Sequence, residues 1–345
     1  MPLPSSFIHR KLALEDPMTT TEIVGDPGSG EVAPTRIPKN KLEDPAPPRK
    51  RPSLVPYLLI LPATAIVVLA MGYPLVWQLI TSMQHFGLAQ QFGTAPPEWV
   101  WFDNYIQLFS DPYMWKVVFR SIIFMAAAAV STMIIGLGVA LLMKASPTPV
   151  RIIMQIALLL AWAMPVVAAM TVWTWLFDWR RGLINWLLTK AGIPMQGHNW
   201  LADPKSFFIV AAIIVIWMSV PFVAFSLYAG LTQVPEEILE AAEVDGATPF
   251  QQLRQIILPM IRPVVGIVFL LQIIWDLRVF TQIKLLQDQG SISTETNLLG
   301  TYIYQLGVGR SDFAMASAVS IFVLLLTIML SAAYVRNLIK EDEDQ

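Results

Sequence analysis

The 345-residue sequence contains no cysteine and few charged residues. Without cysteine, the chain cannot form a disulfide, a thiolate metal site or a cysteine nucleophile. Charged residues make up 14% of the sequence and hydrophobic residues 55%, whereas about a quarter of a soluble domain is charged. This composition is typical of an integral membrane protein. The net charge of −2 gives no indication of a nucleic-acid partner.

Patterns that carry catalysis or nucleotide binding are also missing. The three histidines, His9, His85 and His198, are widely separated and show no metal-ligand spacing. The sequence has no Gly-x-x-x-x-Gly-Lys-Ser/Thr phosphate-binding loop. It shows no Ser-His-Asp arrangement and no pair of catalytic glutamates. We therefore predict that the chain is not an enzyme and binds no metal or cofactor itself.

Six apolar runs are long enough to cross the roughly 30 Å hydrocarbon core of a membrane. Four prolines inside these runs, Pro62, Pro74, Pro165 and Pro221, predict local kinks. The fold class predicted is an all-α membrane protein with six transmembrane helices. These helices are expected near Pro56–Met83, Val117–Met143, Val150–Phe177, Ser206–Ala229, Met260–Gln282 and Phe313–Val335.

The two ends of the chain differ from the apolar middle. Residues 1–52 hold ten of the 26 prolines, and such a segment cannot bury enough apolar surface to offset its chain entropy. We expect a disordered cytoplasmic tail there, with Met18 as an alternative start to Met1. The basic cluster Arg49–Arg51 precedes the first run, so the positive-inside rule predicts that both termini are cytoplasmic. The membrane domain then covers residues 53–340, followed by an acidic tail, 341–345.

An amphipathic stretch, residues 235–259, separates the fourth and fifth runs. Pro235 suits the first turn of a helix, and Gly246 supplies the left-handed residue that ends a helix over Glu236–Val244. Thr248 can cap a second helix, with Pro249 at its first position. The sequence therefore predicts a helix, a sharp turn and a second helix on the cytoplasmic side.

The first of these helices has two different faces. One interpretation is a short surface helix in a membrane-protein loop. The other is a docking element, because two adjacent alanines allow another surface to come close. The acidic face carries Glu236, Glu240 and Glu243, and the other face carries Ile238, Ala241, Ala242 and Asp245.

The order Glu-Ala-Ala, three residues, Gly, nine residues, Ile-x-Leu-Pro resembles the EAA loop of permease subunits of bacterial ABC importers. The matching positions are Glu240, Ala241, Ala242, Gly246, Ile256, Leu258 and Pro259. In that family the loop docks into a cleft on a cytoplasmic ATPase subunit. The resemblance implies that the helix at Glu236–Gly246 is a coupling helix. Its expected ATPase contacts are Glu240, Ala241, Ala242, Asp245 and Gly246.

Four fragments of the predicted outer loops resemble the sugar-permease branch of the same family, the maltose-type branch. Anchoring of aromatic residues at the membrane interface is the alternative explanation for them. The fragments are Phe102–Tyr105, Phe109–Pro112, Gly182–Asn185 and Trp200–Pro204.

The segment after the fifth run departs from the sugar branch. That branch commonly has Asp after a Phe and then Thr-x-Gly-Gly-Pro. Here Phe280 is followed by Thr281, and the later segment reads Gln287-Asp288-Gln289-Gly290-Ser291. This departure weakens the argument for a sugar as the solute, but it leaves the resemblance to a transporter intact.

The resemblance implies the type I importer permease fold and a subunit that moves a sugar, of di- or oligosaccharide size, by alternating access. The implied partners are a second related permease, two copies of an ATPase that binds ATP–Mg, and an extracytoplasmic sugar-binding protein. The implied location is the lipid of the cytoplasmic membrane. Alternatives are a permease for another solute such as glycerol phosphate and an ion-coupled secondary transporter, although inverted repeats are not evident. An intramembrane enzyme would need a nucleophile and base that are not visible.

Polar residues inside the fifth run indicate where a solute could pass. Gln272 and Asp276 are four residues apart and share a helix face, while Arg278 lies on another. Each charge near the membrane centre costs about 2.5–3.5 kcal/mol. Pairing with neighbouring helices would explain them, and so would a sugar site in which aromatic rings stack on the solute. The aromatic candidates are Trp275, Trp217 and Trp162, although packing is the commoner role of such residues.

Overall fold

The computed structural model describes residues 55–343, which are mainly helical and include two short strands. The predicted tail over residues 1–52 lies outside the described residues, as do residues 344–345. Residues from Ile60 onward form one compact unit, and the packing described below belongs to that unit.

Five helical stretches in the described part are long and apolar enough to cross a membrane. The last of them continues as a helix to Glu343, so it takes in the beginning of the predicted acidic tail. The elements that form the five stretches are α1 (Val55–Val67) with the π-helical turn η1 (Val68–Gly72) and α2 (Tyr73–Ser82), then α5 (Pro112–Ala145), α9 (Pro204–Leu231), α13 (Arg262–Leu277) with α14 (Thr281–Gln287), and α17 (Phe313–Glu343).

The third apolar run differs from the single span expected over Val150–Phe177. It forms two helices, α6 (Thr148–Ala163) and α7 (Val166–Leu176), which are bent by 98° at the break between them. Pro165 explains the break, because proline removes a backbone donor and keeps the residue before it out of the helical conformation. Met164 is accordingly extended, with φ −67° and ψ 127°. The kink expected at Pro165 is therefore present, and the sixth span exists only if this bent pair is counted as one.

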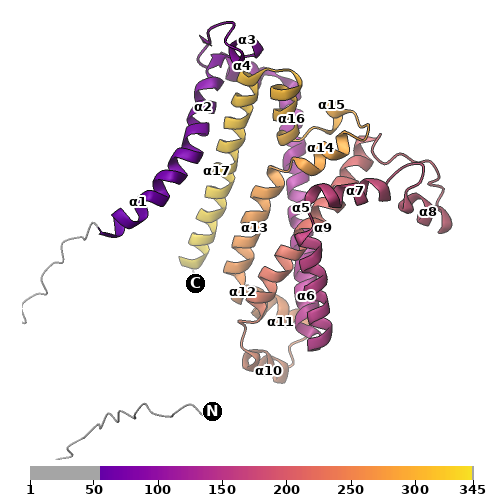
Figure 1. The fold of residues 1–345 in the computed structure, drawn as a ribbon. Helices are drawn as coiled ribbons and strands as arrows, with labels where there is room; N and C mark the ends of the chain where they lie inside the picture. The colour runs from indigo at the N-terminus through magenta and orange to yellow at the C-terminus, as the bar shows by residue number, and fades with distance from the viewer. Residues whose placement is uncertain (1–54, 344–345) are drawn as a thin grey trace, which may run out of the picture. The chain divides into compact units, whose positions relative to one another are not determined.

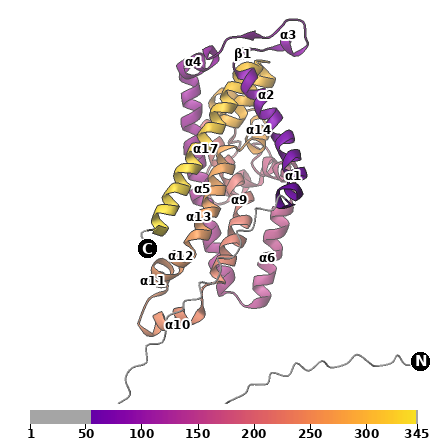
Figure 2. The ribbon, with the colours of Figure 1, turned by 90° about the vertical axis from the view of Figure 1, so that its left-hand side faces the viewer.

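Most of the shorter elements lie towards the two ends of the long helices (Figure 1, Figure 2), whereas α8 lies to one side of them in Figure 1. At one end is the loop formed by α10 and α11, and at the other are the two strands, which pair antiparallel with Gln84 opposite Trp99. The shorter elements are β1 (Gln84–His85), α3 (Leu88–Gln91), β2 (Glu98–Trp99), α4 (Asp103–Ser110), α8 (Leu183–Lys190), α10 (Glu236–Val244), α11 (Pro249–Gln252), η2 (Leu253–Ile257), α12 (Leu258–Met260), α15 (Ser293–Thr296), α16 (Leu299–Tyr304) and η3 (Gln305–Gly309).

A stripe of small residues on α5 allows it to pack closely along α9. Ala128, Thr132, Gly136 and Ala140 recur every four residues and are all buried. A Cβ added at Gly136 would lie 2.5 Å from Val223 Cγ1 of α9, so no larger side chain fits there without a shift. Because lipid provides no hydrophobic drive between spans, such close packing is what holds transmembrane helices together.

The four loop fragments that resemble the sugar branch form hydrogen bonds within the loops and at the starts of long helices. The Asn104 amide donates to the carbonyl oxygens of Ser82 and Gln84, both at 2.9 Å. The Asn185 amide donates to the His198 carbonyl at 2.9 Å, and its oxygen accepts from Trp200 Nε1 at 2.6 Å. Two aspartates of the fragments cap long helices, Asp111 for α5 and Asp203 for α9. These bonds close the loops and set where the spans begin.

Candidate coupling loop and substrate pocket

The loop between α9 and α13 has the helix–turn–helix geometry expected from its sequence. Helix α10 ends at Val244, and Gly246 has φ +83°, a conformation that only glycine adopts freely. The Gly246 N–H donates to the Glu243 carbonyl at 2.9 Å. Thr248 and Gln251 form a reciprocal capping box at the start of α11. The second helix continues through Ile256 as the π-helical turn η2 rather than as a regular α-helix.

The residues expected to contact an ATPase lie mostly on the exposed surface of this loop. Glu240, Ala241, Asp245 and Gly246 are exposed, whereas Ala242 is half-buried. The inner side of the loop is held by Leu239 and Leu253, which pack against a buried cluster that includes Leu231, Val234 and Ile257.

The loop also exposes large apolar side chains, and two of them, Val244 and Phe250, were not singled out from the sequence. Val244 is 88% exposed and Phe250 69% exposed, on either side of the Gly246 turn. Ile238, on the outer side of α10, is 41% exposed. Clustered apolar side chains at a turn suit a contact surface for another protein. Their hydrophobicity was visible in the sequence, but their exposure depends on how the loop folds.

A pocket of about 420 Å³ lies among α6, α9, α13 and the break before α14. Four of the residues predicted to line the pathway, Trp162, Trp275, Asp276 and Arg278, line it together. Gln272 does not line the pocket but lies behind it, fully buried and four residues before Asp276. The structure therefore brings five of the six predicted residues to one place and leaves out Trp217.

The Asp276 carboxylate is the polar centre of this pocket. Its side chain is nearly buried, and the Gln272 amide donates to both carboxylate oxygens at 3.0 Å. Among the side chains that the structure describes, residues 58–336, Asp276 is not a member of the ion pair found, Lys284–Asp288. A buried carboxylate requires hydrogen-bond donors. Asp276 thus faces the pocket with capacity to accept hydrogen bonds from a ligand.

Arg278 lines the same pocket but is exposed and lies just beyond the last residue of α13. The expected pairing of Asp276 or Arg278 with a neighbouring helix is therefore not found as an ion pair in the described part of the chain. The guanidinium group keeps five donors available in a rigid fork.

Aromatic rings form one wall of the pocket. Phe222 of α9 contacts Trp275 edge to face, with 5.0 Å between ring centroids, and lies 6.4 Å from Trp162. Trp217, by contrast, packs against Trp173 at 5.6 Å and lines a separate apolar pocket. Sequence reasoning missed Phe222, together with Met218 and Ser219 on the same face of α9. Their three- and four-residue spacing in the sequence places them on one face of a helix. The sequence does not show which other helix this face contacts.

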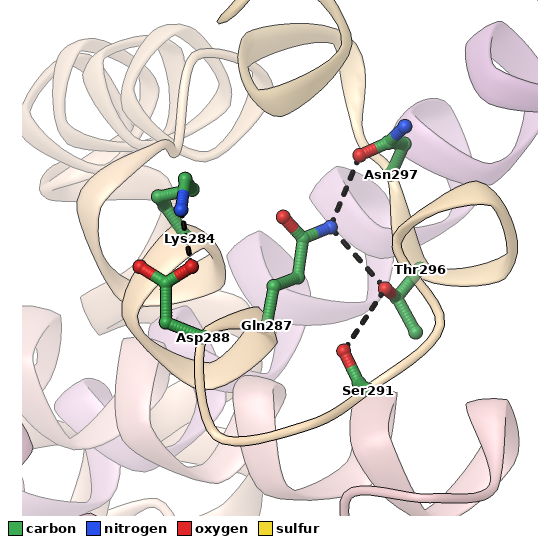
Figure 3. A network of polar contacts seen from close by, with 6 residues as sticks. All are labelled: Lys284, Gln287, Asp288, Ser291, Thr296 and Asn297. Atoms are coloured by element: carbon green, nitrogen blue, oxygen red, sulfur yellow. Dashed lines mark hydrogen bonds and ion pairs between the residues drawn. The ribbon is translucent and has the colours of Figure 1, made fainter. Parts of the chain in front are cut away.

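The segment after α13 contains a buried polar cluster, shown in Figure 3. The Gln287 amide donates to Thr296 Oγ1 at 3.2 Å and to Asn297 Oδ1 at 3.1 Å. Asn297 in turn donates to the Tyr113 hydroxyl at 2.9 Å, and its carbonyl accepts from Arg120 of α5 at 3.1 Å. This cluster lies where the sequence departs from the sugar-branch signature, and it fastens the loop onto α5.

A bundle of apolar helices with an amphipathic helix–turn–helix loop and a polar pocket defines a multi-pass membrane permease. The chain belongs to the family of binding-protein-dependent transport system inner membrane components, which it matches over residues 133–337. The resemblance to ABC importer permeases is thereby confirmed, and the chain is a membrane transport subunit.

Two relatives match most of the chain. The diacetylchitobiose uptake system permease protein DasB of Streptomyces coelicolor is 40% identical over 294 residues, covering 85% of this chain and 89% of that protein. The trehalose/maltose transport system permease protein MalF of Thermococcus litoralis is 30% identical over 284 residues, covering 81% and 92%.

The fold is similar to that of a solved importer. A chain from the crystal structure of a bacterial alginate ABC transporter, in complex with an alginate pentasaccharide-bound periplasmic protein, aligns with a TM-score of 0.69. The alignment covers 81% of this chain and 92% of that chain at 20% identity. At this identity the likeness establishes the fold alone.

Proposed function

We propose that this chain is the membrane-spanning permease of an ATP-driven importer that carries a sugar of di- or oligosaccharide size. The observation that carries the proposal is the pocket at Asp276, which combines a buried carboxylate, an arginine fork and an aromatic wall. Sugar hydroxyls donate to carboxylates and accept from guanidinium groups, while the C–H faces of sugar rings lie against aromatic rings. Relatives named for diacetylchitobiose and for trehalose and maltose support the same class of solute.

Each pocket residue has a distinct part in this proposal. Asp276 accepts hydrogen bonds from sugar hydroxyls, and Gln272 holds its carboxylate in place from behind. Arg278 donates to the sugar, and Trp275 and Phe222 supply the apolar wall. An anionic solute such as glycerol phosphate fits less well, because the buried Asp276 carboxylate would repel a phosphate group.

The loop at α10 is the proposed point at which ATP-driven movement enters the chain. Two copies of an ATPase, which bind ATP–Mg, would sit beneath this permease and a second related permease, and α10 would dock into one ATPase. The exposed Glu240, Ala241 and Phe250 support this role. Because α11, η2 and α12 lead directly into α13, a displacement of the loop is transmitted towards Asp276.

The rest of the assembly follows from this arrangement. An extracytoplasmic sugar-binding protein would deliver the solute to the end of the bundle opposite α10. Both termini would be cytoplasmic, the chain would lie in the cytoplasmic membrane, and ATP would be hydrolysed by the ATPase alone.

The proposal is tested by uptake into proteoliposomes that contain this chain with its partner permease, ATPase and binding protein. Diacetylchitobiose, maltose, trehalose and glycerol 3-phosphate serve as labelled solutes. We expect ATP-dependent uptake of at least one sugar, competition among sugars only, and no nucleotide hydrolysis by the purified chain alone. Uptake restricted to glycerol 3-phosphate, or ATP hydrolysis by the isolated chain, would contradict the proposal.

A further inference from the structure

A second, larger pocket lies beside the one at Asp276. Its volume is about 720 Å³, and it is formed by α2, α16, η3 and α17. Phe280, in the break between α13 and α14, lines both pockets. The two pockets therefore share a wall, although none of the sequence patterns considered above involves the second one.

The lining of this second pocket has the chemistry of a carbohydrate site. Trp77 and Tyr304 contribute aromatic rings, and Gln78 and Ser317 contribute an amide and a hydroxyl. Aromatic faces bind the C–H surfaces of sugar rings, and amides and hydroxyls both donate to and accept from sugar hydroxyls. The lining is largely apolar, so a lipid acyl chain is the competing occupant, but it would form no hydrogen bond with Gln78, Thr81 or Ser317.

Thr81 is an independent indication that a polar ligand binds here. Its side chain is 3% exposed and lines the pocket, and its Oγ1 has no hydrogen-bond partner among the described residues. A helical threonine hydroxyl usually donates to the carbonyl four residues earlier. Burying a hydroxyl without a partner is unfavourable, so this group is suited to a ligand that bonds to it.

Phe280, which lines both pockets, and the neighbouring Val279 pack closely against α16. The rings of Phe280 and Tyr304 lie 5.4 Å apart. Gly300 of α16 approaches the break so closely that an added Cβ would lie 3.0 Å from the Val279 carbonyl oxygen. Phe280 is the lining residue that the two pockets have in common, so it marks the point that a ligand extending from one pocket to the other would have to pass.

We propose that the pocket at Trp77 and Thr81 is a second carbohydrate subsite, which binds the sugar rings of an oligosaccharide that extend beyond the pocket at Asp276. This inference rests on the proposed function. In this proposal, the first pocket, formed mainly by α9 and α13, binds the sugar, and the second pocket, lined by α2 and α17, favours longer oligosaccharides. A disaccharide fills the first pocket alone, whereas a tetrasaccharide occupies both.

The test compares two lengths of the same sugar in the reconstituted importer. The probes are the disaccharide and tetrasaccharide of β-1,4-linked N-acetylglucosamine, and maltose with maltotetraose. The variants are Thr81→Val, which removes only the hydroxyl, and Trp77→Ala. Matched controls are Thr327→Val, whose hydroxyl bonds within α17 to Val323, and Trp99→Ala on β2.

We expect both pocket variants to raise the half-saturating concentration of a tetrasaccharide by about fivefold, the loss of one hydrogen bond or stacking contact. Uptake of the disaccharide, and both uptakes in the controls, should be unchanged. Unaltered tetrasaccharide uptake in the variants, or an equal loss for both lengths, would overturn the inference. The inference would also be overturned if a phospholipid copurified with the wild type and was lost from Trp77→Ala, while uptake in that variant did not depend on the length of the sugar.

The same measurements distinguish a failure of this inference from a failure of the proposed function. If Asp276→Asn lowers disaccharide uptake about tenfold while Thr81→Val leaves tetrasaccharide uptake unchanged, the first pocket is the substrate site and only the second subsite is rejected. If the wild-type importer takes up neither series of sugars, the proposed function and this inference are both rejected.

Discussion

The coupling loop and the pocket at Asp276 are built in opposite ways. In the loop, the turn is closed by hydrogen bonds between residues three to five apart, such as Gly246 to Glu243 and Ala247 to Ala242, and its surface is exposed. The pocket is assembled from α6, α9 and α13, which bring Trp162, Phe222 and Asp276 together across more than a hundred residues of sequence. The loop is a local structure with an exposed surface, and the pocket is a tertiary structure formed where three helices meet.

This difference separates two kinds of mutational effect. A change in the loop should leave the bundle intact and disturb the contact with the ATPase. A change in the pocket should leave ATPase binding intact and disturb the solute, unless it alters the packing of the helices themselves. The four predictions below test this separation.

The largest effect is expected from Gly246→Val. Valine is strained at φ +83°, and no atom lies within 4 Å of the position of an added Cβ, so the effect comes from the backbone alone. We expect uptake to fall to background and copurification of the ATPase to fall more than tenfold, with normal insertion in the membrane. Gly192→Val, at φ +88° in the loop after α8, is the matched control and should retain both activities. Full uptake by Gly246→Val would remove the argument for the loop as coupling element.

Asp276→Asn should have the next largest effect. The asparagine preserves size but removes the charge and one acceptor site, so we expect uptake to fall about tenfold, equivalent to about 1.4 kcal/mol. Assembly and ATPase binding should persist, because a neutral amide is easier to bury than a carboxylate. Asp288→Asn, which removes the exposed partner of Lys284, is the control. Failure of Asp276→Asn to assemble would show that the carboxylate is structural.

Gly136→Ala tests whether the pocket depends on distant helix packing. The added methyl would meet Val223 at 2.5 Å, and overpacking of this kind costs about 1–3 kcal/mol. We expect a lower temperature of thermal inactivation and a partial loss of uptake. Gly138→Ala, two residues away with open space around it, should change neither. Equal stability of the two variants would mean that α5 and α9 have room to separate.

Thr248→Ala should have the smallest effect. It removes the side-chain half of the capping box with Gln251, which stabilises the start of α11 by about 1 kcal/mol. We expect the affinity for the ATPase to fall by about fivefold at most, measured by titration of the purified ATPase. A loss as large as that of Gly246→Val would show that α11 itself contacts the ATPase.

The same contrast explains what could be predicted from the sequence. The glycine turn, the Thr248 cap and a kink at Pro165 each depend on a few neighbouring residues, so they could be predicted from the sequence. The sequence did not show that the kink divides the third run into two helices bent by 98°. The contact of Phe222 with Trp275 depends on which faces of α9 and α13 meet. A membrane helix that is apolar on all sides has no amphipathic pattern, so its packing face cannot be predicted from the sequence. For the same reason Trp217 was grouped with a pocket that it does not line.

Only some of the buried polar residues could be predicted from the sequence. Asp276 and Gln272 stood out because polar groups are expensive in an apolar run. The Gln287–Asn297 cluster did not, because glutamine and asparagine are ordinary in a loop, and only the fold shows that they are buried.

Helix α5 is much longer than a membrane is thick. Its 34 residues extend about 50 Å at 1.5 Å per residue, against about 30 Å of hydrocarbon. Near its start, Arg120 and Ser121 hold the segment that carries Asn297 and Leu299, and near its end Lys144 Nζ donates to the Leu231 carbonyl beside the α10 loop. One long helix is thus held by hydrogen bonds near both ends of the bundle. A tilt of α5 would displace both contacts at once and would carry a movement beside the α10 loop to the opposite end of the bundle.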